Sequence, residues 1–171
     1  MSGAAPPRLT GGMFALMVAA LIAATMTTGL MAGVFGLYQH TVMAGLAGTD
    51  DRTFIGAFQA LDRAIINPWF MFSFGGALLF TAVAAFLNPS PWVFAALGLY
   101  LVVFVITVAV NVPLNDALKA AGPPDSLADP AAVRAAFNEA RWTAWNLVRT
   151  LATTTAFGFL CWALVARGKL G

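Results

Sequence analysis

The side chains of this sequence that could carry out chemistry are few, and most are spaced for one face of a helix. Asn111 and Asn115 are four residues apart, and Asn146 and Arg149 are three residues apart, so each pair would share a helix face. Arg149 is the only ionised residue inside the long apolar stretches of the chain. A guanidinium with amide neighbours can bind an anion, or stabilise an oxyanion as it forms in a reaction.

Aromatic and histidine side chains supply the other groups that such a site would need. His40 is the single histidine, and imidazole readily exchanges a proton near neutral pH, which makes it the candidate general base. The indoles of Trp142 and Trp145 could stack on a flat ligand. The candidate catalytic residues are His40, Asn111, Asn115, Asn146 and Arg149, and the candidate substrate-binding residues are Tyr38, Asn67, Trp142 and Trp145.

Ordinary structural roles explain the same residues. Two indoles at the end of an apolar stretch are typical of the aromatic belt at a membrane surface. His40 fits a solvated side chain, and Asn111 with Asn115 fits hydrogen bonding between helices. Arg149 fits a side chain that extends to lipid headgroups. The residue types alone leave both interpretations open.

Composition excludes several functional classes. The 171 residues contain one cysteine, Cys161, and one histidine, so an internal disulfide and the common metal-binding motifs are absent and no metal is predicted. Nine Lys and Arg against seven Asp and Glu give a net charge of only +2, without a basic stripe, so nucleic acid is not an expected partner. The sequence leaves any cofactor unknown, and the reaction considered below needs none.

Hydropathy places the chain in a membrane. The residues are 60% apolar and 9% charged, and the mean hydropathy is +0.83, whereas soluble domains are about 25% charged. Four apolar stretches, at about 13–46, 68–87, 92–113 and 142–166, reach the ~20 residues that a spanning helix requires. They lack the alternation of strands. The sequence therefore predicts an all-α integral membrane protein, a single domain over 1–171 built as an up-down four-helix transmembrane bundle.

The segments between these spans are polar. In the loop at about 47–67, apolar residues recur at helical spacing and predict a short amphipathic helix. Two placements stay open for this helix, in the membrane interface or packed over the mouth of the bundle. The second polar loop covers about 115–141, and Asp129-Pro130 within it marks a helix start. Small residues in the first two spans predict close helix packing: Gly29, Gly33, Gly36, Gly75 and Gly76.

Up-down connectivity places all the candidate site residues on one side of the membrane and both termini on the other. The side of the termini carries Arg8, Arg167 and Lys169, and the opposite side carries the five Lys and Arg of the polar loops together with all seven acids. The count of basic residues alone favours the side opposite the termini as cytoplasmic, whereas the net charge favours the side of the termini. We expect both termini to be cytoplasmic, in a bacterial inner membrane, because Arg167 and Lys169 directly follow a span.

Four segments of the chain resemble the anthrone oxygenase-like membrane proteins, a group from bacteria and fungi. They are AGVFGLYQHTVMAGL at 32–46, INPWFMFSFGG at 66–76, NVPLNDAL at 111–118 and RWTAWNLVRT at 141–150. The resemblance implies a four-span bundle and, for some fungal members, oxidation of an anthrone to an anthraquinone. The family pattern falls on Asn67, Asn111, Pro113, Asn115, Trp142, Trp145, Asn146 and Arg149. Gln39 and His40 depart from it, because they occupy places that are usually small or apolar.

Three functions follow as hypotheses. The first is an anthrone oxygenase-like enzyme that oxidises a flat lipophilic phenolic substrate with molecular oxygen, with Arg149 and the amides stabilising the anion and His40 as the base. The second is a non-catalytic subunit or assembly factor of a larger membrane complex. The third is a binder of a quinone, pigment or lipid. The expected partners are the lipid bilayer and a lipophilic small molecule, with a homo-oligomer or larger complex also open. A pocket at Arg149 would favour the first and third hypotheses.

Overall fold

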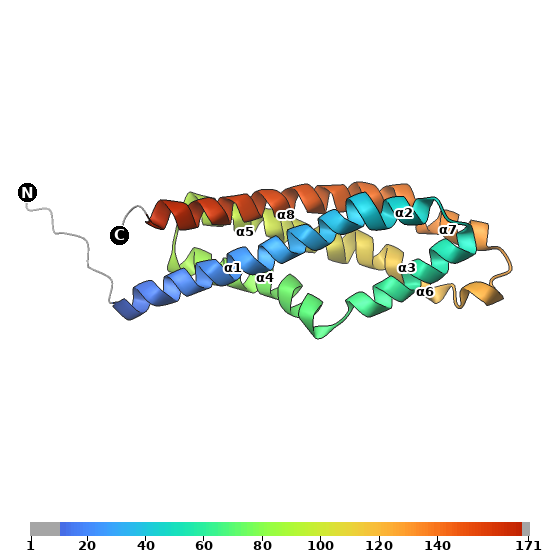
Figure 1. Ribbon diagram of the computed structural model, residues 1–171, viewed down its shortest axis with the longest axis horizontal. Helices are drawn as coiled ribbons and strands as arrows, with labels where there is room; N and C mark the ends of the chain where they lie inside the picture. The colour runs from blue at the N-terminus through green and yellow to red at the C-terminus, as the bar shows by residue number, and fades with distance from the viewer. Residues whose placement is uncertain (1–10, 169–171) are drawn as a thin grey trace, which may run out of the picture.

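The computed structural model describes residues 11–168, and these residues form helices and no strands. Three long helical runs, at 11–47, 91–120 and 130–168, are interrupted only by π-helical turns or a single residue. Two separate helices connect the first run to the second (Figure 1). The elements in chain order are α1 (Gly11–Leu37), the π-helix η1 (Tyr38–Val42), α2 (Met43–Ala47), α3 (Asp51–Ile65), α4 (Pro68–Leu87), α5 (Pro91–Ile106), the π-helix η2 (Thr107–Asn111), α6 (Val112–Ala120), the 3-10 turn η3 (Pro124–Ser126), α7 (Pro130–Phe137) and α8 (Glu139–Gly168).

Four helical stretches are long and apolar enough to cross a membrane: Gly11–Ala47, Pro68–Leu87, Pro91–Ala120 and Pro130–Arg167. They confirm the predicted all-α, four-span fold, and the protein is an integral membrane protein. The third stretch continues past the predicted end near residue 113, because α6 carries the helix onward through Pro113. The fourth includes α7, which is separated from α8 by Asn138 in a left-handed conformation with φ of 56°.

The spans form a ring in which α1 packs against α4 and α8, and α5 packs against α4 and α8. The turn between α4 and α5 lies at the same end as the start of α1 and the end of α8 (Figure 1). At that end Arg167 donates from Nη2 to Asn88 Oδ1 over 2.7 Å. Arg8 and Lys169, which entered the orientation argument, lie outside the described residues. The opposite end carries α3, α6 and α7, as the sequence predicts for its two polar loops.

At two of the five glycines predicted to allow close helix packing, a neighbouring helix leaves little room for a side chain. A Cβ at Gly29 would lie 2.8 Å from the Phe157 ring on α8, so a side chain at this position would require the ring to shift. At Gly76 a Cβ would lie 3.4 Å from the methyl group of Thr27 and 3.1 Å from the ring of Phe80. Gly36 has an ordinary contact, while Gly33 and Gly75 have no neighbour within 4 Å, so the prediction was wrong for those two.

Helix α3 covers one end of the bundle. Phe54, Ile55 and Phe58 are buried and pack with residues of α6, α7 and α8 in one apolar cluster, which favours the second of the two placements considered for this amphipathic helix. Asp50 caps its start and accepts hydrogen bonds from the hydroxyl and backbone N–H of Thr53, which hold the pKa of Asp50 below its ordinary value. The cap therefore stabilises α3 at neutral pH and is lost in acid as this carboxylate protonates.

Polar contacts attach α3 to the loops around it. Gln59 donates from Nε2 to the carbonyls of Leu118 and Gly122 over 2.9 and 3.0 Å. Arg134 on α7 pairs with Asp51 and Glu139, and its guanidinium lies 4.3 Å from the centre of a phenyl ring on α3. The Gln59 bonds and the Arg134–Asp51 pair join segments that are 59 to 83 residues apart in the chain, so they fix α3 in place over the end of the bundle.

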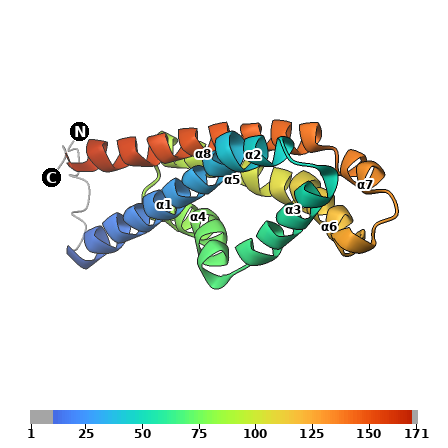
Figure 2. The ribbon, with the colours of Figure 1, turned by 45° about the vertical axis from the view of Figure 1, so that its right-hand side comes forward.

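A sharp elbow joins α3 to α4, and Asn67 forms it (Figure 2). Its Oδ1 accepts hydrogen bonds from the backbone N–H groups of Trp69 and Phe70, both at 3.0 Å, and its Nδ2 donates to the Ala64 carbonyl at 2.9 Å. The side chain thus caps the helix that follows and holds the one that precedes it. Pro68 occupies the first turn of α4, where its missing N–H costs no hydrogen bond.

Replacing this cap tests the description of the elbow. We expect Asn67→Ala to lower the free energy of unfolding in detergent by about 1 kcal/mol, because two N–H groups lose their acceptor. Asn67→Asp keeps the acceptor for both N–H groups but loses the donor to the Ala64 carbonyl, so its stability should lie between that of Asn67→Ala and that of wild type. Denaturant titrations followed by circular dichroism measure both variants. Equal stability of Asn67→Ala and wild type would contradict this role.

Candidate functional site

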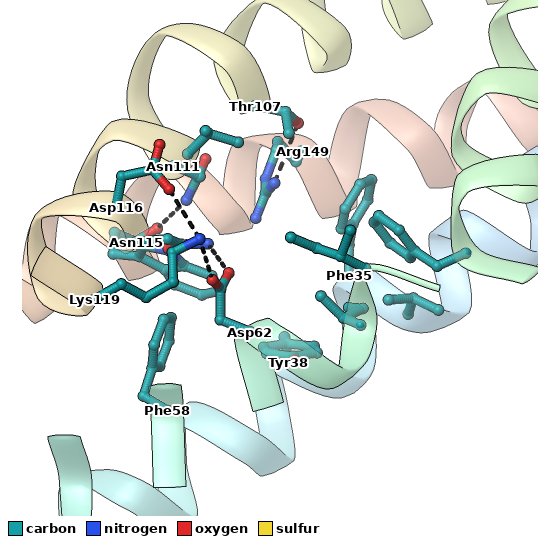
Figure 3. Close-up of a pocket in the computed structure, with 16 residues that line it drawn as sticks. Phe35, Tyr38, Phe58, Asp62, Thr107, Asn111, Asn115, Asp116, Lys119 and Arg149 are labelled. Atoms are coloured by element: carbon teal, nitrogen blue, oxygen red, sulfur yellow. Dashed lines mark hydrogen bonds and ion pairs between the residues drawn. The ribbon is translucent and has the colours of Figure 1, made fainter. Parts of the chain in front are cut away.

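A cavity of about 140 Å³ lies inside the end of the bundle that α3 covers. Five parts of the chain enclose it: the end of α1 with η1, the last turns of α3, the first turn of α4, the η2–α6 segment, and α8 (Figure 3). Its apolar wall consists of Val34, Phe35, Phe58, Ile65, Ile66, Phe70 and Val112. Its polar wall and adjoining rings consist of Tyr38, Asp62, Thr107, Asn111, Asn115, Asp116, Lys119, Trp142 and Arg149.

Arg149 is the buried cation of this pocket, with 5% of its surface exposed. Its Nη1 donates to Thr107 Oγ1 over 3.1 Å, and its Nη2 donates to Asn146 Oδ1 over 2.8 Å. Its Nε has no hydrogen-bond partner within the described residues. No carboxylate within residues 11–168 forms a salt bridge with it. A guanidinium has five N–H groups, so this side chain retains donors for a ligand.

Aromatic rings flank the same guanidinium. Its central carbon lies 4.5 Å from the ring centre of Phe35 and 5.5 Å from that of Trp142. Both distances lie within the range of cation–π attraction, which is worth about 2 kcal/mol for a desolvated cation. The rings partly offset the cost of removing the charge from water, yet they supply no negative charge. The site is therefore suited to an anionic or strongly polarised oxygen.

Asn146 holds Arg149 from behind, on the side away from the cavity wall. Its Oδ1 accepts from Arg149, while its Nδ2 donates to Gln39 Oε1 over 2.9 Å and to the Phe35 carbonyl over 3.1 Å. Because every contact uses the amide in one orientation, the oxygen can face only the guanidinium. The first span thereby fixes the position of a cation on the fourth.

A second polar cluster lies across the pocket. Asp62, 7% exposed, accepts from Asn115 Nδ2 over 2.7 Å at one oxygen and pairs with Lys119 over 2.9 Å at the other (Figure 3). Lys119 also pairs with Asp116 over 2.9 Å. The indole Nε1 of Trp142 donates to Asn115 Oδ1 over 2.8 Å, so this cluster joins α3, α6 and α8.

Two π-helical segments shape the wall. Pro113 has no N–H to donate to the carbonyl four residues earlier, and the helix widens into η2 just before it. This segment ends at Asn111, whose Nδ2 donates to the Trp142 carbonyl over 3.3 Å. The other segment, η1, contributes Tyr38. Such π-helical turns are frequent at functional sites.

The structure brings together most of the residues singled out from the sequence. Five of them line the pocket: Tyr38, Asn111, Asn115, Trp142 and Arg149. Asn146 lies directly behind Arg149, and Asn67 sets the elbow next to two wall residues. His40 is exposed, outside the pocket lining, and bonds through Nδ1 to Thr41 Oγ1 over 2.7 Å. Trp145 is 39% exposed and also lies outside the pocket lining.

Sequence reasoning missed Asp62 and Lys119 as members of the site. A signal for Asp62 was present, since it follows Ile55 and Phe58 at helical spacing on the buried and largely apolar face of α3. Lys119 offered none, because it lies in the last turn of α6, where a cation is ordinary. Within residues 11–168 no three His, Cys, Asp or Glu side chains form a group that could hold a metal ion.

The fold and the pocket define this protein as a four-span membrane protein with an internal, cation-bearing cavity. A family model described as anthrone oxygenase matches residues 64–159, more than half of the chain. The protein belongs to the anthrone oxygenase family, which confirms the resemblance identified from the sequence. No curated protein and no solved structure matches the chain. The matched region includes Arg149 and both asparagines of the pocket wall, and it begins two residues after Asp62.

The buried bonds of Asn146 give a direct test of the site's construction. Asn146→Leu removes the acceptor of a buried cation and two interhelical donor contacts, so we expect the free energy of unfolding to fall by about 1–3 kcal/mol. Leu147→Ala is the matched control on the same helix, since this side chain is 43% exposed and its loss should cost under about 1 kcal/mol. Denaturant titration in detergent compares them, and an Asn146→Leu protein as stable as the control would contradict the network.

Proposed function

We propose that this protein binds a flat lipophilic phenolic compound in the pocket and oxidises it with molecular oxygen, as an anthrone oxygenase does with an anthrone. Membership of the family supports the reaction class. The polar groups around a largely apolar pocket support a ligand with a hydrophobic ring system and an oxygen at one edge. The cavity beside Arg149 also favours ligand binding over the purely structural role of a subunit or assembly factor.

One observation carries the proposal. Arg149 is nearly buried and borders a cavity, and its hydrogen-bond partners within residues 11–168 are neutral, the Thr107 hydroxyl and the Asn146 amide. A charge removed from water is costly unless an opposite charge accompanies it. An oxyanion of the ligand would provide that charge. The site would therefore bind the ionised form of a phenolic ketone more tightly than the neutral form.

The chemistry follows from that preference. An anthrone has a weakly acidic methylene group opposite its carbonyl, and removing one proton gives an anion whose charge spreads to the carbonyl oxygen. Arg149 would stabilise this oxygen. The electron-rich anion can react with oxygen without a cofactor, and loss of water from the resulting hydroperoxide gives a second carbonyl. One anthrone and one O₂ thus yield one anthraquinone and one water.

Access from the bilayer fits such a ligand. Two apolar wall residues are exposed, Ile66 at 60% and Val112 at 40%, and lipid would contact both. A flat apolar compound partitions into the hydrocarbon and would reach the pocket between them. Asp116 provides a polar part of the rim, with a side chain that is 59% exposed. The pocket would therefore communicate with both lipid and water.

The placement in the cell is also a proposal. We infer a bacterial inner membrane with both termini in the cytoplasm, on the basis of Arg167 next to the end of a span. The pocket would then open near the outer face of that membrane. A homo-oligomer or a larger membrane complex is compatible with the exposed apolar surface of the spans.

A binder or carrier of a quinone or pigment is the second candidate, because the same pocket and cation would serve it. The two functions separate by turnover. A binder would hold an anthraquinone without consuming oxygen, whereas an oxygenase would consume oxygen in proportion to the anthraquinone formed.

Removing the guanidinium tests the proposal. With anthrone as substrate, we expect Arg149→Met to lower oxygen consumption above the detergent background by at least about a hundredfold, because the developing oxyanion loses its charge partner. Arg141→Met is the matched control, since Arg141 is exposed and lies outside the pocket lining, and it should match wild type. An oxygen electrode together with absorbance of the quinone product measures both. Wild-type protein that consumes oxygen no faster than detergent alone would overturn the proposed oxidation.

A further inference from the structure

Asp62 is the buried carboxylate of the pocket, and it has no role in the oxidation as proposed above. It is 7% exposed and comes from α3, whereas Arg149 comes from α8. Both side chains border the same cavity (Figure 3). The other carboxylate in the pocket wall, Asp116, is largely exposed. A ligand in the cavity would therefore lie between a buried cation and a buried carboxylate.

The bonds of Asp62 leave it able to accept a proton. Its Oδ1 holds the Asn115 amide, and its Oδ2 holds the Lys119 ammonium. A carboxylate has about four lone-pair positions, so the two named donors do not occupy all of them. The same donors fix the orientation of the carboxylate. This arrangement resembles that of a positioned general base, which needs a fixed location and a free lone pair.

Lys119 differs from Arg149 in its charge balance. Lys119 is shared by two carboxylates, each at 2.9 Å, while Arg149 has none within the described residues. With a neutral ligand bound, one cation therefore has an extra negative partner and the other has none. Moving one negative charge from Asp62 to the ligand would leave Lys119 paired with Asp116 and would give Arg149 an anion. Every charge in the pocket would then have one opposite partner.

We propose that Asp62 is the catalytic residue that accepts the proton from the ligand's methylene group, and that Asp116 is a positioning residue that keeps Lys119 paired afterwards. This inference rests on the proposed oxidation. In the step, the carbon–hydrogen bond breaks, the proton forms an O–H bond with Asp62, and the electron pair stays on the ligand as an enolate whose oxygen lies at Arg149. Asp62 later releases the proton to water at the polar rim beside Asp116. Lys119 stays protonated throughout.

The other titratable groups around Asp62 are less suited to this role. Lys119 on α6 is held between two carboxylates and has no free lone pair while protonated. Tyr38 on η1 would have to lose its own proton before it could accept one. Arg149 on α8 is the partner of the anion, Asp116 on α6 lies at the exposed rim, and Arg63 beside Asp62 on α3 is exposed. His40 lies outside the pocket lining.

Hydrogen–deuterium exchange of anthrone without oxygen isolates the proton transfer. Purified protein in detergent, made with D₂O and kept anaerobic, should exchange the methylene hydrogens of anthrone faster than detergent alone, as measured by mass spectrometry. Asp62→Asn should lower this enzyme-dependent exchange by at least about a hundredfold, the usual contribution of a general base. Its dissociation constant for anthraquinone should stay within threefold of wild type, which shows a folded pocket. Unchanged exchange in Asp62→Asn, or a loss of exchange in His40→Ala or Tyr38→Phe instead, would overturn the assignment.

A second variant keeps the test valid if Asp62→Asn fails to fold. Asp116 is exposed, so Asp116→Asn should fold normally. In this variant, however, Lys119 would lose its remaining carboxylate partner once Asp62 has accepted the proton and become neutral. We expect exchange about tenfold slower, with anthraquinone binding unchanged, which a purely structural role would not produce. The matched control is Asp125→Asn in the exposed turn η3, outside the pocket lining, and it should equal wild type. Exchange in Asp116→Asn equal to that of this control would overturn the pairing argument.

The anaerobic exchange experiment and the oxygen-electrode assay together separate this inference from the proposed function. If wild-type protein exchanges the methylene hydrogens of anthrone but consumes no oxygen, the role of Asp62 as proton acceptor stands and the proposed oxidation is overturned. If Asp62→Asn still oxidises anthrone and its exchange rate is unchanged, the proposed oxidation stands and the role of Asp62 as proton acceptor is overturned. Wild-type protein that does neither would overturn both.

Discussion

The structure of the pocket depends on one constraint, a buried guanidinium with no carboxylate paired to it in the part of the chain that the structure describes. Removing such a charge from water costs several kcal/mol unless polar groups or an anion replace the solvent. Here one hydroxyl, one amide and two aromatic rings replace part of it. The remainder of the site is arranged so that a ligand oxygen can complete the coordination of Arg149.

Each structural element near the pocket serves that arrangement. The proline at position 113 widens the third span into a π-helix, and Thr107 at the start of that segment bonds to the guanidinium. The elbow at Asn67 turns the chain so that both α3 and the first turn of α4 contribute to the apolar wall. Polar bonds from α3 to the loops hold the covering helix in place. The apolar half of the bundle, built on Leu21, Ala24 and Leu160, provides the support for all of them.

Much of this could be predicted from the sequence. Long apolar stretches specify four spans, because the bilayer sets a minimum helix length. Up-down connectivity then places the asparagines, Trp142 and Arg149 at the same end, and helical spacing gives Arg149 and Asn146 a common face. These predictions rely only on local periodicity and chain direction, which a sequence displays directly.

The remaining features depend on contacts between distant segments. Asp62 belongs to the site because α3 folds back over the bundle, and its partner Lys119 lies 57 positions later in the chain; no spacing rule reports such a contact. His40 and Trp145 have suitable chemistry, but their exposed positions follow from the rotation of each helix about its axis. That rotation is set by packing, and in η1 it also depends on a π-helical turn that the sequence did not reveal.

The most direct measurement of the central claim is the ionisation of a phenolic ligand bound beside Arg149. A hydroxyanthraquinone changes colour when it loses its phenolic proton, so a pH titration of its absorbance reports the pKa of the bound phenol. We expect wild-type protein to lower this pKa relative to the ligand in detergent alone, because the guanidinium favours the anion, and we expect Arg149→Met to remove the shift. A bound ligand whose pKa is unchanged or raised in wild type, or equally lowered in the variant, would contradict the claim.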